Sequence, residues 1–291
     1  MAILVKYLSI QIVLTEMTNL VPMAGEGRRF ADVGYTVPKP LIEVSGTPMI
    51  VKAIRSMPPS DDWVFVCRQE HIDKYGIDDV LKKELPNCEI IIVNKTTEGQ
   101  ASTCMLAKDI IDMDKPLFIG ACDNGIIMDG NKWQRAASLD SDAIILTFTK
   151  QPNLTRNPKA YGWVVEKNGL VERISVKVPV SEDPFGDHAV VGSFWFKSGR
   201  TFVDATEQMM RKNIRTNNEF YVDSVPMEIV ANGGKVRMFD IEQYIGWGVP
   251  ADLEEYEHWE NVFMHKKETD DDRKSDFYSF WKRYFAENLI R

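Results

Sequence analysis

A glycine-containing loop follows a short apolar segment near the start of the chain. Residues 19–24 read Asn-Leu-Val-Pro-Met-Ala, and Gly25 and Gly27 come directly after them. Glycine lets the backbone turn tightly, and because it lacks a Cβ atom, backbone N–H groups can approach a phosphate closely. Arg29 follows at once, and Lys39 stands between two prolines in a Pro-Lys-Pro-Leu segment. The pattern predicts a phosphate-binding turn in which Arg29 and Lys39 supply the positive charge that a triphosphate needs.

This loop resembles the signature of the sugar-phosphate nucleotidylyltransferases, in which Gly-x-Gly-Ser/Thr-Arg-Leu/Phe is followed by Pro-Lys-Pro-Leu. Later blocks agree in order, so the similarity runs from about residue 19 to residue 259. Arg29 matches the arginine of the family, whereas Arg28 replaces its small hydroxyl residue and either contacts a phosphate or points into solvent. The resemblance implies a nucleotide site that includes four residues of the loop: Ala24, Gly25, Gly27 and Arg28.

Strand-like and helix-like segments alternate through the first half of the chain. Strands are expected at 20–24, 63–67, 89–93, 117–121 and 143–148, and helices at 49–57, 70–85, 100–111 and 133–139. The second half suggests a hairpin at 162–176 with an Asn-Gly turn, a strand at 190–196, helices at 201–211 and 222–231, and strands at 236–241 and 244–247. This order predicts an α/β fold, a Rossmann-like and mostly parallel mixed sheet with helices on both faces. Ligands in such folds lie beyond the carboxyl ends of the strands.

Three regions are expected along the chain. Residues 1–18 form an N-terminal extension, residues 19–259 the nucleotidyltransferase catalytic domain, and residues 260–291 a charged linker with a C-terminal amphipathic helix. We expect this helix to dock on the chain's own body, with a contact in a homo-oligomer and binding to a membrane surface as alternatives. Its apolar face consists of aromatic residues at helical spacing: Phe277, Phe280, Trp281, Tyr284 and Phe285.

Composition excludes several classes of function. A net charge of −8 argues against general nucleic-acid binding. The four cysteines are widely spaced, which favours a reducing cytoplasm and neither a disulfide framework nor a zinc site. No apolar run reaches the roughly 18 residues that a membrane span requires. We therefore expect a cytoplasmic protein whose partners are small molecules.

An aspartate at the end of a predicted strand is the candidate metal ligand. Asp123 follows the segment 117–121, where a carboxylate could hold Mg²⁺ over bound phosphates. The structural alternative is an Asp-Asn-Gly turn in which Asp123 caps the backbone. The resemblance supports the metal, because the family has a Gly-Asp-Asn motif here whose aspartate binds it.

The second metal-binding aspartate of the family is missing from its usual place. Residues 244–253 resemble the closing block Asp-x-Gly-Thr-Pro-x-Asp-Leu, and Gly246 falls where that aspartate stands. Asp252 is expected at the start of the following helix instead. Either Asp240 or Glu242 compensates, or one ion suffices.

A second glycine-containing turn is the candidate base-binding element. Gly99 and Gln100 open a predicted helix, and in the family a comparable turn lies against the nucleobase. Backbone groups there and the amide of Gln100 could read a pyrimidine edge. Alternatively, the segment is an ordinary helix N-terminus in which the helix dipole favours Glu98.

The candidate acceptor site draws on three later segments. Tyr161 and Gly162 resemble the family segment that lines the sugar pocket, and Lys177 matches the lysine that holds the acceptor phosphate. Val176 replaces the glutamate that contacts sugar hydroxyls in the family, which predicts poor use of glucose 1-phosphate. Glu219 either contacts the acceptor or caps the helix that begins near residue 222.

The resemblance implies transfer of a nucleoside monophosphate from a nucleoside triphosphate to a phosphorylated acceptor, with Mg²⁺ as cofactor and pyrophosphate as product. Arg29, Lys39 and Lys177 would be the catalytic residues. The absence of a recognisable nucleophile fits a reaction that depends on positioning and charge neutralisation. Three functions remain open: a sugar 1-phosphate nucleotidylyltransferase, a cytidylyltransferase for a non-sugar, phosphocholine-like acceptor, and a non-catalytic nucleotide- or sugar-binding regulator.

Overall fold

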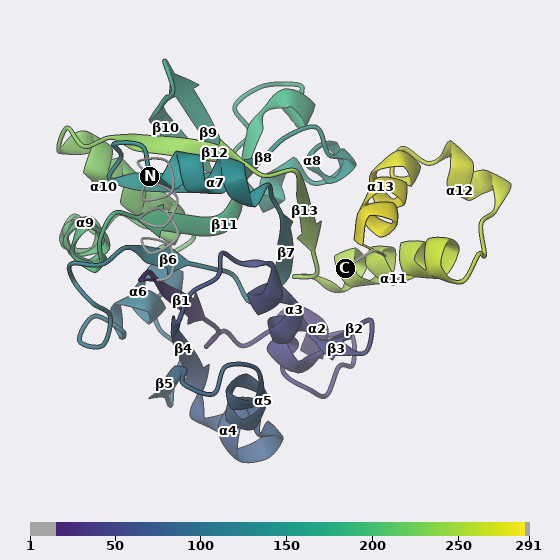
Figure 1. Ribbon diagram of the computed structural model, residues 1–291, viewed down its shortest axis with the longest axis horizontal. Coiled ribbons are helices and arrows are strands. Elements are labelled where there is room, and N and C mark those ends of the chain that lie inside the picture. The colour runs from purple at the N-terminus through teal and green to yellow at the C-terminus, as the bar shows by residue number, and fades with distance from the viewer. Residues whose placement is uncertain (1–15, 289–291) are drawn as a thin grey trace, which may run out of the picture.

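A nine-stranded mixed sheet forms the centre of the protein in the computed structural model (Figure 1). The structure describes residues 16–288, so most of the predicted extension 1–18 lies outside the described residues. The strands are β1 (Thr18–Pro22), β4 (Asp62–Arg68), β5 (Glu89–Val93), β6 (Leu117–Ile119), β8 (Ala143–Phe148), β9 (Gly162–Lys167), β10 (Leu170–Val176), β11 (His188–Phe196) and β12 (Val236–Asp240).

The sheet combines a parallel part with an antiparallel part. Its main path runs β10-β9-β11-β6-β1-β4-β5, and β8 joins β11 to β12. Strands β6, β1, β4 and β5 are parallel, as are β8 and β12, whereas β11 runs antiparallel to β6, β8 and β9. The parallel part brings the carboxyl ends of β1 and β6 together, which positions the site described below.

Helices cover both faces of the sheet, because successive strand residues point to opposite faces. In β1, Val21 belongs to one buried cluster and Leu20 to the other. The first cluster includes residues of α3 (Met49–Ser56), α5 (Ile77–Glu84) and α7 (Gly130–Ala137). The second includes residues of α6 (Gln100–Met105), α9 (Gly199–Arg211) and α10 (Val225–Ala231). The predicted fold class is confirmed.

Several predicted boundaries differ from the structure for local reasons. The helix expected at 70–85 is two helices, α4 (Gln69–Tyr75) and α5, because Gly76 adopts a left-handed φ of 61° between them. Thr47–Pro48 forms the short strand β3, paired with β2 (Glu43–Val44), directly before α3, which ends one residue earlier than expected. A 3₁₀ turn, η4 (Val222–Ser224), precedes α10.

Two turns in the second half bear on the site. The β9–β10 hairpin turns through Asn168 and Gly169, which both have positive φ, as its Asn-Gly sequence predicts. A separate pair of strands, β7 (Asn124–Ile127) and β13 (Gln243–Gly246), places Gly246 opposite Asn124. The backbone N–H of Trp247 then donates to the carbonyl of Asp123 at 2.9 Å.

The C-terminal helices pack on the body of the chain. They are α11 (Pro250–Met264), α12 (Asp270–Lys274) and α13 (Tyr278–Asn288), and they gather beside β13 in Figure 1. Trp281 and Phe285 of α13 are buried against Tyr256 of α11. The predicted docking in cis is therefore confirmed, and α11 runs through the boundary that the sequence placed at residue 259. Within residues 16–288, no helix combines the length and the apolar character needed to cross a bilayer.

Candidate active site

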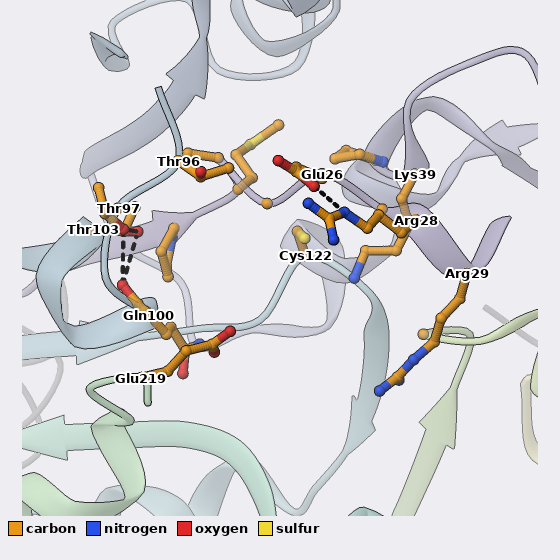
Figure 2. Close-up of a pocket in the computed structure, with 18 of the residues that line it drawn as sticks. Glu26, Arg28, Arg29, Lys39, Thr96, Thr97, Gln100, Thr103, Cys122 and Glu219 are labelled. Atoms are coloured by element: carbon orange, nitrogen blue, oxygen red, sulfur yellow. Dashed lines mark hydrogen bonds and ion pairs between the residues drawn. The ribbon is translucent and has the colours of Figure 1, made fainter. Parts of the chain in front are cut away.

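A cavity of about 590 Å³ lies beyond the carboxyl ends of β1 and β6, where ligands of α/β sheets bind. Figure 2 shows its walls. The nucleotide loop, residues 24–29, forms one side of the cavity. The turn at Gly99 and the segment at Glu219 form the other side. Nine residues predicted from the sequence line it: Ala24, Gly25, Gly27, Arg28, Arg29, Lys39, Gly99, Gln100 and Glu219.

The nucleotide loop depends on Gly27 and leaves open space at Gly25. Gly27 has a left-handed φ of 64° and precedes α2 (Arg28–Ala31). A Cβ atom on Gly27 would lie 3.2 Å from the Cβ of Lys39, so the glycine lets the two segments touch. Nothing lies within 4 Å of a Cβ built on Gly25. That open space fits the approach of a phosphate to the backbone.

The two arginines of the loop differ in their surroundings. The guanidinium of Arg28 forms an ion pair with Glu26 at the edge of the cavity. The side chain of Arg29 extends away from that pair (Figure 2), and within residues 16–288 it has no ion pair or hydrogen bond. The charge of Arg29 also acts on Lys177: burial lowers the pKa of Lys177, and Arg29 lowers it further, so the two cations lie near each other. Arg29 therefore offers its guanidinium to a ligand between the nucleotide loop and the acceptor segments.

Lys39 and Asp123 form an ion pair beside the cavity. The Nζ of Lys39 lies 2.6 Å from the Oδ2 of Asp123. Burial, the largest single influence, lowers the pKa of Lys39, but the charge and hydrogen bond of Asp123 together with the Cys122 thiol outweigh it and hold that pKa above its ordinary value. The side chain of Asp123 accepts a hydrogen bond from this lysine and does not cap a turn. The next residue, Asn124, already begins strand β7.

The donor set around Asp123 fits a magnesium ion that also uses substrate oxygens. Among residues 16–288, no group of three or more His, Cys, Asp or Glu side chains could hold a metal by itself. Mg²⁺ is usually held by one or two carboxylates together with substrate phosphates, so a complete protein cage is not needed. Asp123, one residue after the cavity-lining Cys122, supplies such a carboxylate.

The turn at Gly99 is fixed to the segment that carries Glu219. Gly99 has a φ of 122°, and a Cβ atom there would lie 2.7 Å from both the N and the O of Phe220. The N–H of Phe220 donates to the carbonyl of Glu98, and its carbonyl accepts from Ala101. The carboxylate of Glu98 pairs with Arg215. The turn therefore holds a fixed backbone edge against the cavity, and Gln100 and Glu219 lie next to each other on this side of it (Figure 2).

Lys177 is held at the end of β10 by the segment that contains Tyr161. Its N–H donates to the carbonyl of Tyr161 at 3.0 Å, and its Nζ donates to the carbonyl of Ala160 at 2.7 Å. It adopts a left-handed φ of 65°. Its Nζ lies 5.9 Å from the ring centre of Tyr221, which lines the cavity. Tyr161, Gly162 and Lys177 thus form a group that adjoins the cavity without lining it.

Sequence reasoning missed a carboxylate in this group. The Oδ2 of Asp223 lies 2.6 Å from where a Cβ of Gly162 would be, so this carboxylate closely approaches the backbone of Gly162. Burial raises the pKa of Asp223 to about 6, and the charge of Lys177 partly opposes the rise. Within residues 16–288, no side chain donates a hydrogen bond to this carboxylate. Asp223 stands in the same matched block as Glu219, but its burial beside Lys177 cannot be read from the sequence.

Glu219 itself does not cap the following helix. Its backbone forms a tight turn with Thr216, and Tyr221 occupies the position before η4. The capping alternative is therefore wrong, and the side chain faces the cavity.

The region around Gly246 contains a carboxylate, although the residue itself is glycine. Asp252 lies in the first turn of α11, as predicted, and the Nη2 of Arg156 donates to its Oδ1 at 3.3 Å. Burial raises the pKa of Asp252 to about 6 against the opposing charge of Arg156. The negative charge of Asp123 adds to the rise, so the two carboxylates are close enough to interact.

Asp240 and Glu242, the two residues proposed to replace the missing aspartate, are engaged elsewhere. Asp240 accepts from Thr147 at 2.7 Å and contacts His188 at 2.9 Å. Glu242 accepts from Lys132 at 2.9 Å and from the N–H of Asp129.

A sequence model of one family matches most of this site. The model is described as nucleotidyl transferase, and it matches residues 19–244, which include the loop at Gly25, Asp123, Lys177 and Asp223. The chain belongs to the nucleotidyl transferase family. This nucleotidyltransferase is thus an enzyme, as predicted, and the reading as a non-catalytic regulator is set aside.

Solved structures agree with this family assignment at the level of the fold. A nucleoside-diphosphate-sugar pyrophosphorylase from Vibrio cholerae is 18% identical, with a TM-score of 0.66 over 82% of this nucleotidyltransferase and 98% of that chain. An inositol-1-phosphate CTP transferase from T. maritima is 16% identical, with a TM-score of 0.65 over 84% of this chain and 94% of that one. No curated protein sequence matches the nucleotidyltransferase.

Proposed function

We propose that this nucleotidyltransferase joins a nucleoside monophosphate from a pyrimidine nucleoside triphosphate to a hydroxylated phosphate ester, such as a sugar 1-phosphate or a related acceptor. One observation carries the proposal. Arg28, Arg29 and Lys39 line the nucleotide side of the cavity, and Lys177 lies behind Tyr221 on the other side. Two phosphorylated groups can therefore face each other across the cavity.

The nucleotide side accounts for the triphosphate. The open backbone at Gly25, the free guanidinium of Arg29 and the ammonium of Lys39 would surround the β- and γ-phosphates. Backbone groups at Gly99 and the amide of Gln100 offer donors and acceptors to the edge of a pyrimidine. These contacts would direct the α-phosphorus toward the acceptor segments.

The acceptor side offers a cation next to a carboxylate. Lys177 would hold the acceptor phosphate, and Asp223 beside it would accept hydrogen bonds from acceptor hydroxyls. The carboxylate that is missing at Val176 would thus come from another segment. This arrangement favours a sugar or cyclitol phosphate, and a choline-like acceptor becomes the second candidate.

The reaction follows from these positions. An oxygen of the acceptor phosphate attacks the α-phosphorus in line, the bond to the β-phosphate oxygen breaks, and pyrophosphate leaves. Arg29 and Lys39 would stabilise the negative charge that builds on the leaving group. Mg²⁺, which Asp123 would hold, neutralises charge on the reacting phosphates when it is bound. We also propose a cytoplasmic location, which the four free cysteines support.

A pyrophosphate-release screen tests the proposed function. The purified enzyme is incubated with Mg²⁺ and each of ATP, GTP, CTP, UTP and dTTP, against glucose 1-phosphate, inositol 1-phosphate and phosphocholine. We expect stoichiometric pyrophosphate release with a pyrimidine nucleotide and one of the hydroxylated acceptors. Release of inorganic phosphate in place of pyrophosphate would contradict the proposal, and turnover of phosphocholine alone would select the second candidate.

A further inference from the structure

Gly246, the last residue of β13, and Gly248, two positions later, face two different carboxylates. A Cβ atom on Gly246 would lie 3.4 Å from the Oδ2 of Asp252, and a Cβ atom on Gly248 would lie 2.7 Å from the Oδ2 of Asp123. The glycines are two positions apart, so their Cα atoms lie within about 7 Å of each other. The turn from 246 to 248 therefore brings together two acidic side chains from residues 129 positions apart in the chain, 252 minus 123.

The backbone fixes this turn against the strand that carries Asp123. Gly246 pairs with Asn124 across β13 and β7, and the N–H of Trp247 donates to the carbonyl of Asp123. A Cβ atom on residue 246 would meet the ring of Tyr244 at 3.0 Å and its hydroxyl at 3.2 Å, with the Oδ2 of Asp252 next at 3.4 Å. The carboxylate of Asp252 thus lies in the direction where a carboxylate on residue 246 would lie.

The two oxygens of Asp252 have different surroundings. The guanidinium of Arg156 anchors Oδ1, and Oδ2 is the oxygen that faces Gly246. Arg156 also pairs with Glu255, and Glu255 accepts from the indole N–H of Trp281 in α13. Arg156 therefore holds Asp252 through Oδ1, and Oδ2 remains directed toward the turn at residues 246–248.

We propose that Asp252 is the second acidic ligand of the divalent cation, supplied by the first turn of α11 in place of a carboxylate at residue 246. The inference rests on the proposed function, because it concerns the ion that Asp123 would hold. It means that the chain keeps a two-carboxylate site with phosphates completing the coordination. It also gives the C-terminal helices a role, since Trp281 and Arg156 position the residue that binds the metal.

Mn²⁺ binding to the full chain tests the inference without relying on turnover. Free Mn²⁺ is measured by electron paramagnetic resonance, for the wild type and for Asp123→Asn, Asp252→Asn and Glu254→Gln. We expect Asp252→Asn to weaken Mn²⁺ binding at least tenfold, as Asp123→Asn does. Glu254→Gln removes one negative charge from an exposed side chain of the same helix, so its affinity should stay within about twofold of the wild type.

A relocated carboxylate provides the second arm. Gly246 lies outside the left-handed region, so residue 246 can carry a side chain if the ring of Tyr244, 3.0 Å from the new Cβ, shifts slightly. The double variant Gly246→Asp with Asp252→Asn should recover Mn²⁺ affinity to within about threefold of the wild type. Wild-type affinity in Asp252→Asn alone, with affinity lost in Asp123→Asn, would overturn the inference and leave the proposed function standing. Unchanged affinity in both single variants would overturn the role of Asp123 as well.

Discussion

The ammonium nitrogen of Lys39 lies 2.6 Å from the Oδ2 of Asp123, although the two residues are 84 positions apart. The contact exists because β1 and β6 are parallel neighbours, so the segments that follow them meet at one edge of the sheet. Without substrate, each charge stabilises the other. A bound polyphosphate would offer a new partner to Lys39, and its cation would offer one to Asp123. The ion pair is therefore the state of the site before substrate binds.

Removing the carboxylate of this pair should stop the reaction without unfolding the protein. In Asp123→Asn we expect loss of Mg²⁺-dependent turnover, since the candidate metal ligand is gone, and a lower pKa of Lys39, since its counter-charge is gone. Steady-state assays across Mg²⁺ concentrations and a thermal melt check this. Asp114→Asn, at an exposed site paired with Arg200, is the matched control. Turnover retained at saturating Mg²⁺ would show that Asp123 does not hold the ion.

The free guanidinium of Arg29 gives the clearest prediction for the nucleotide loop. Arg29→Ala should lower kcat/KM by about 10²-fold or more, because a charge contact that stabilises the leaving pyrophosphate is lost. Its melting temperature should change little, since within residues 16–288 the side chain has no ion pair or hydrogen bond to lose. Arg211→Ala on the surface of α9 controls for the loss of one arginine. Unfolding with normal activity in the remaining folded fraction would make Arg29 structural.

The close contact between Gly99 and Phe220 predicts a stability effect. Gly99→Ala would place a Cβ atom 2.7 Å from the backbone of Phe220, at a φ of 122° that other residues rarely adopt. We expect a loss of about 1–3 kcal/mol in the free energy of unfolding, together with a raised KM for the nucleotide. Gly130→Ala, where nothing lies within 4 Å, should stay within about 0.5 kcal/mol in urea denaturation. Equal effects of the two substitutions would mean that the contact is not rigid.

Much of the fold could be predicted because the chain's local patterns agree with its tertiary structure. The strands at residues 89–93 and 143–148 match the predicted bounds, and the Asn168-Gly169 turn follows from its residue types. The antiparallel placement of β11 could not be predicted, since strand direction depends on long-range pairing. The break at Gly76 was missed because a glycine within a helical pattern does not by itself show where the helix stops.

The site shows the same division between local and long-range information. The glycine loop, Arg29, Lys39 and Asp123 were predicted because they stand in contiguous motifs. Asp223 and the relation of Asp252 to Gly246 were not, because they arise where separate segments meet. The spacing of residues along the chain does not show which distant segments come into contact. Burial raises the pKa of each of these two carboxylates to about 6.

The raised pKa of Asp223 predicts a pH-dependent stability effect. A carboxyl group whose folded-state pKa is about 6, against about 4 when unfolded, stabilises the fold fully below pH 4 and loses that contribution as pH rises through 6. Asp223→Asn should therefore melt higher than the wild type at pH 7.5, with the difference shrinking toward pH 4. The variant should also raise the KM for the acceptor. A difference that grows toward low pH would contradict a raised pKa for this partly buried carboxylate.

The most direct test of two facing phosphate sites is a kinetic separation of the two substrates at Lys177. Asn is the chosen replacement, because it tolerates the left-handed φ of 65° better than alanine does. Initial rates of Lys177→Asn are measured while each substrate is varied in turn, with Lys167→Asn at the exposed end of β9 as control. The account predicts that the KM for the acceptor rises at least tenfold, while the KM for the nucleoside triphosphate stays within about twofold. A nucleotide KM that rises as much as the acceptor KM, or an acceptor KM that does not change, would contradict it.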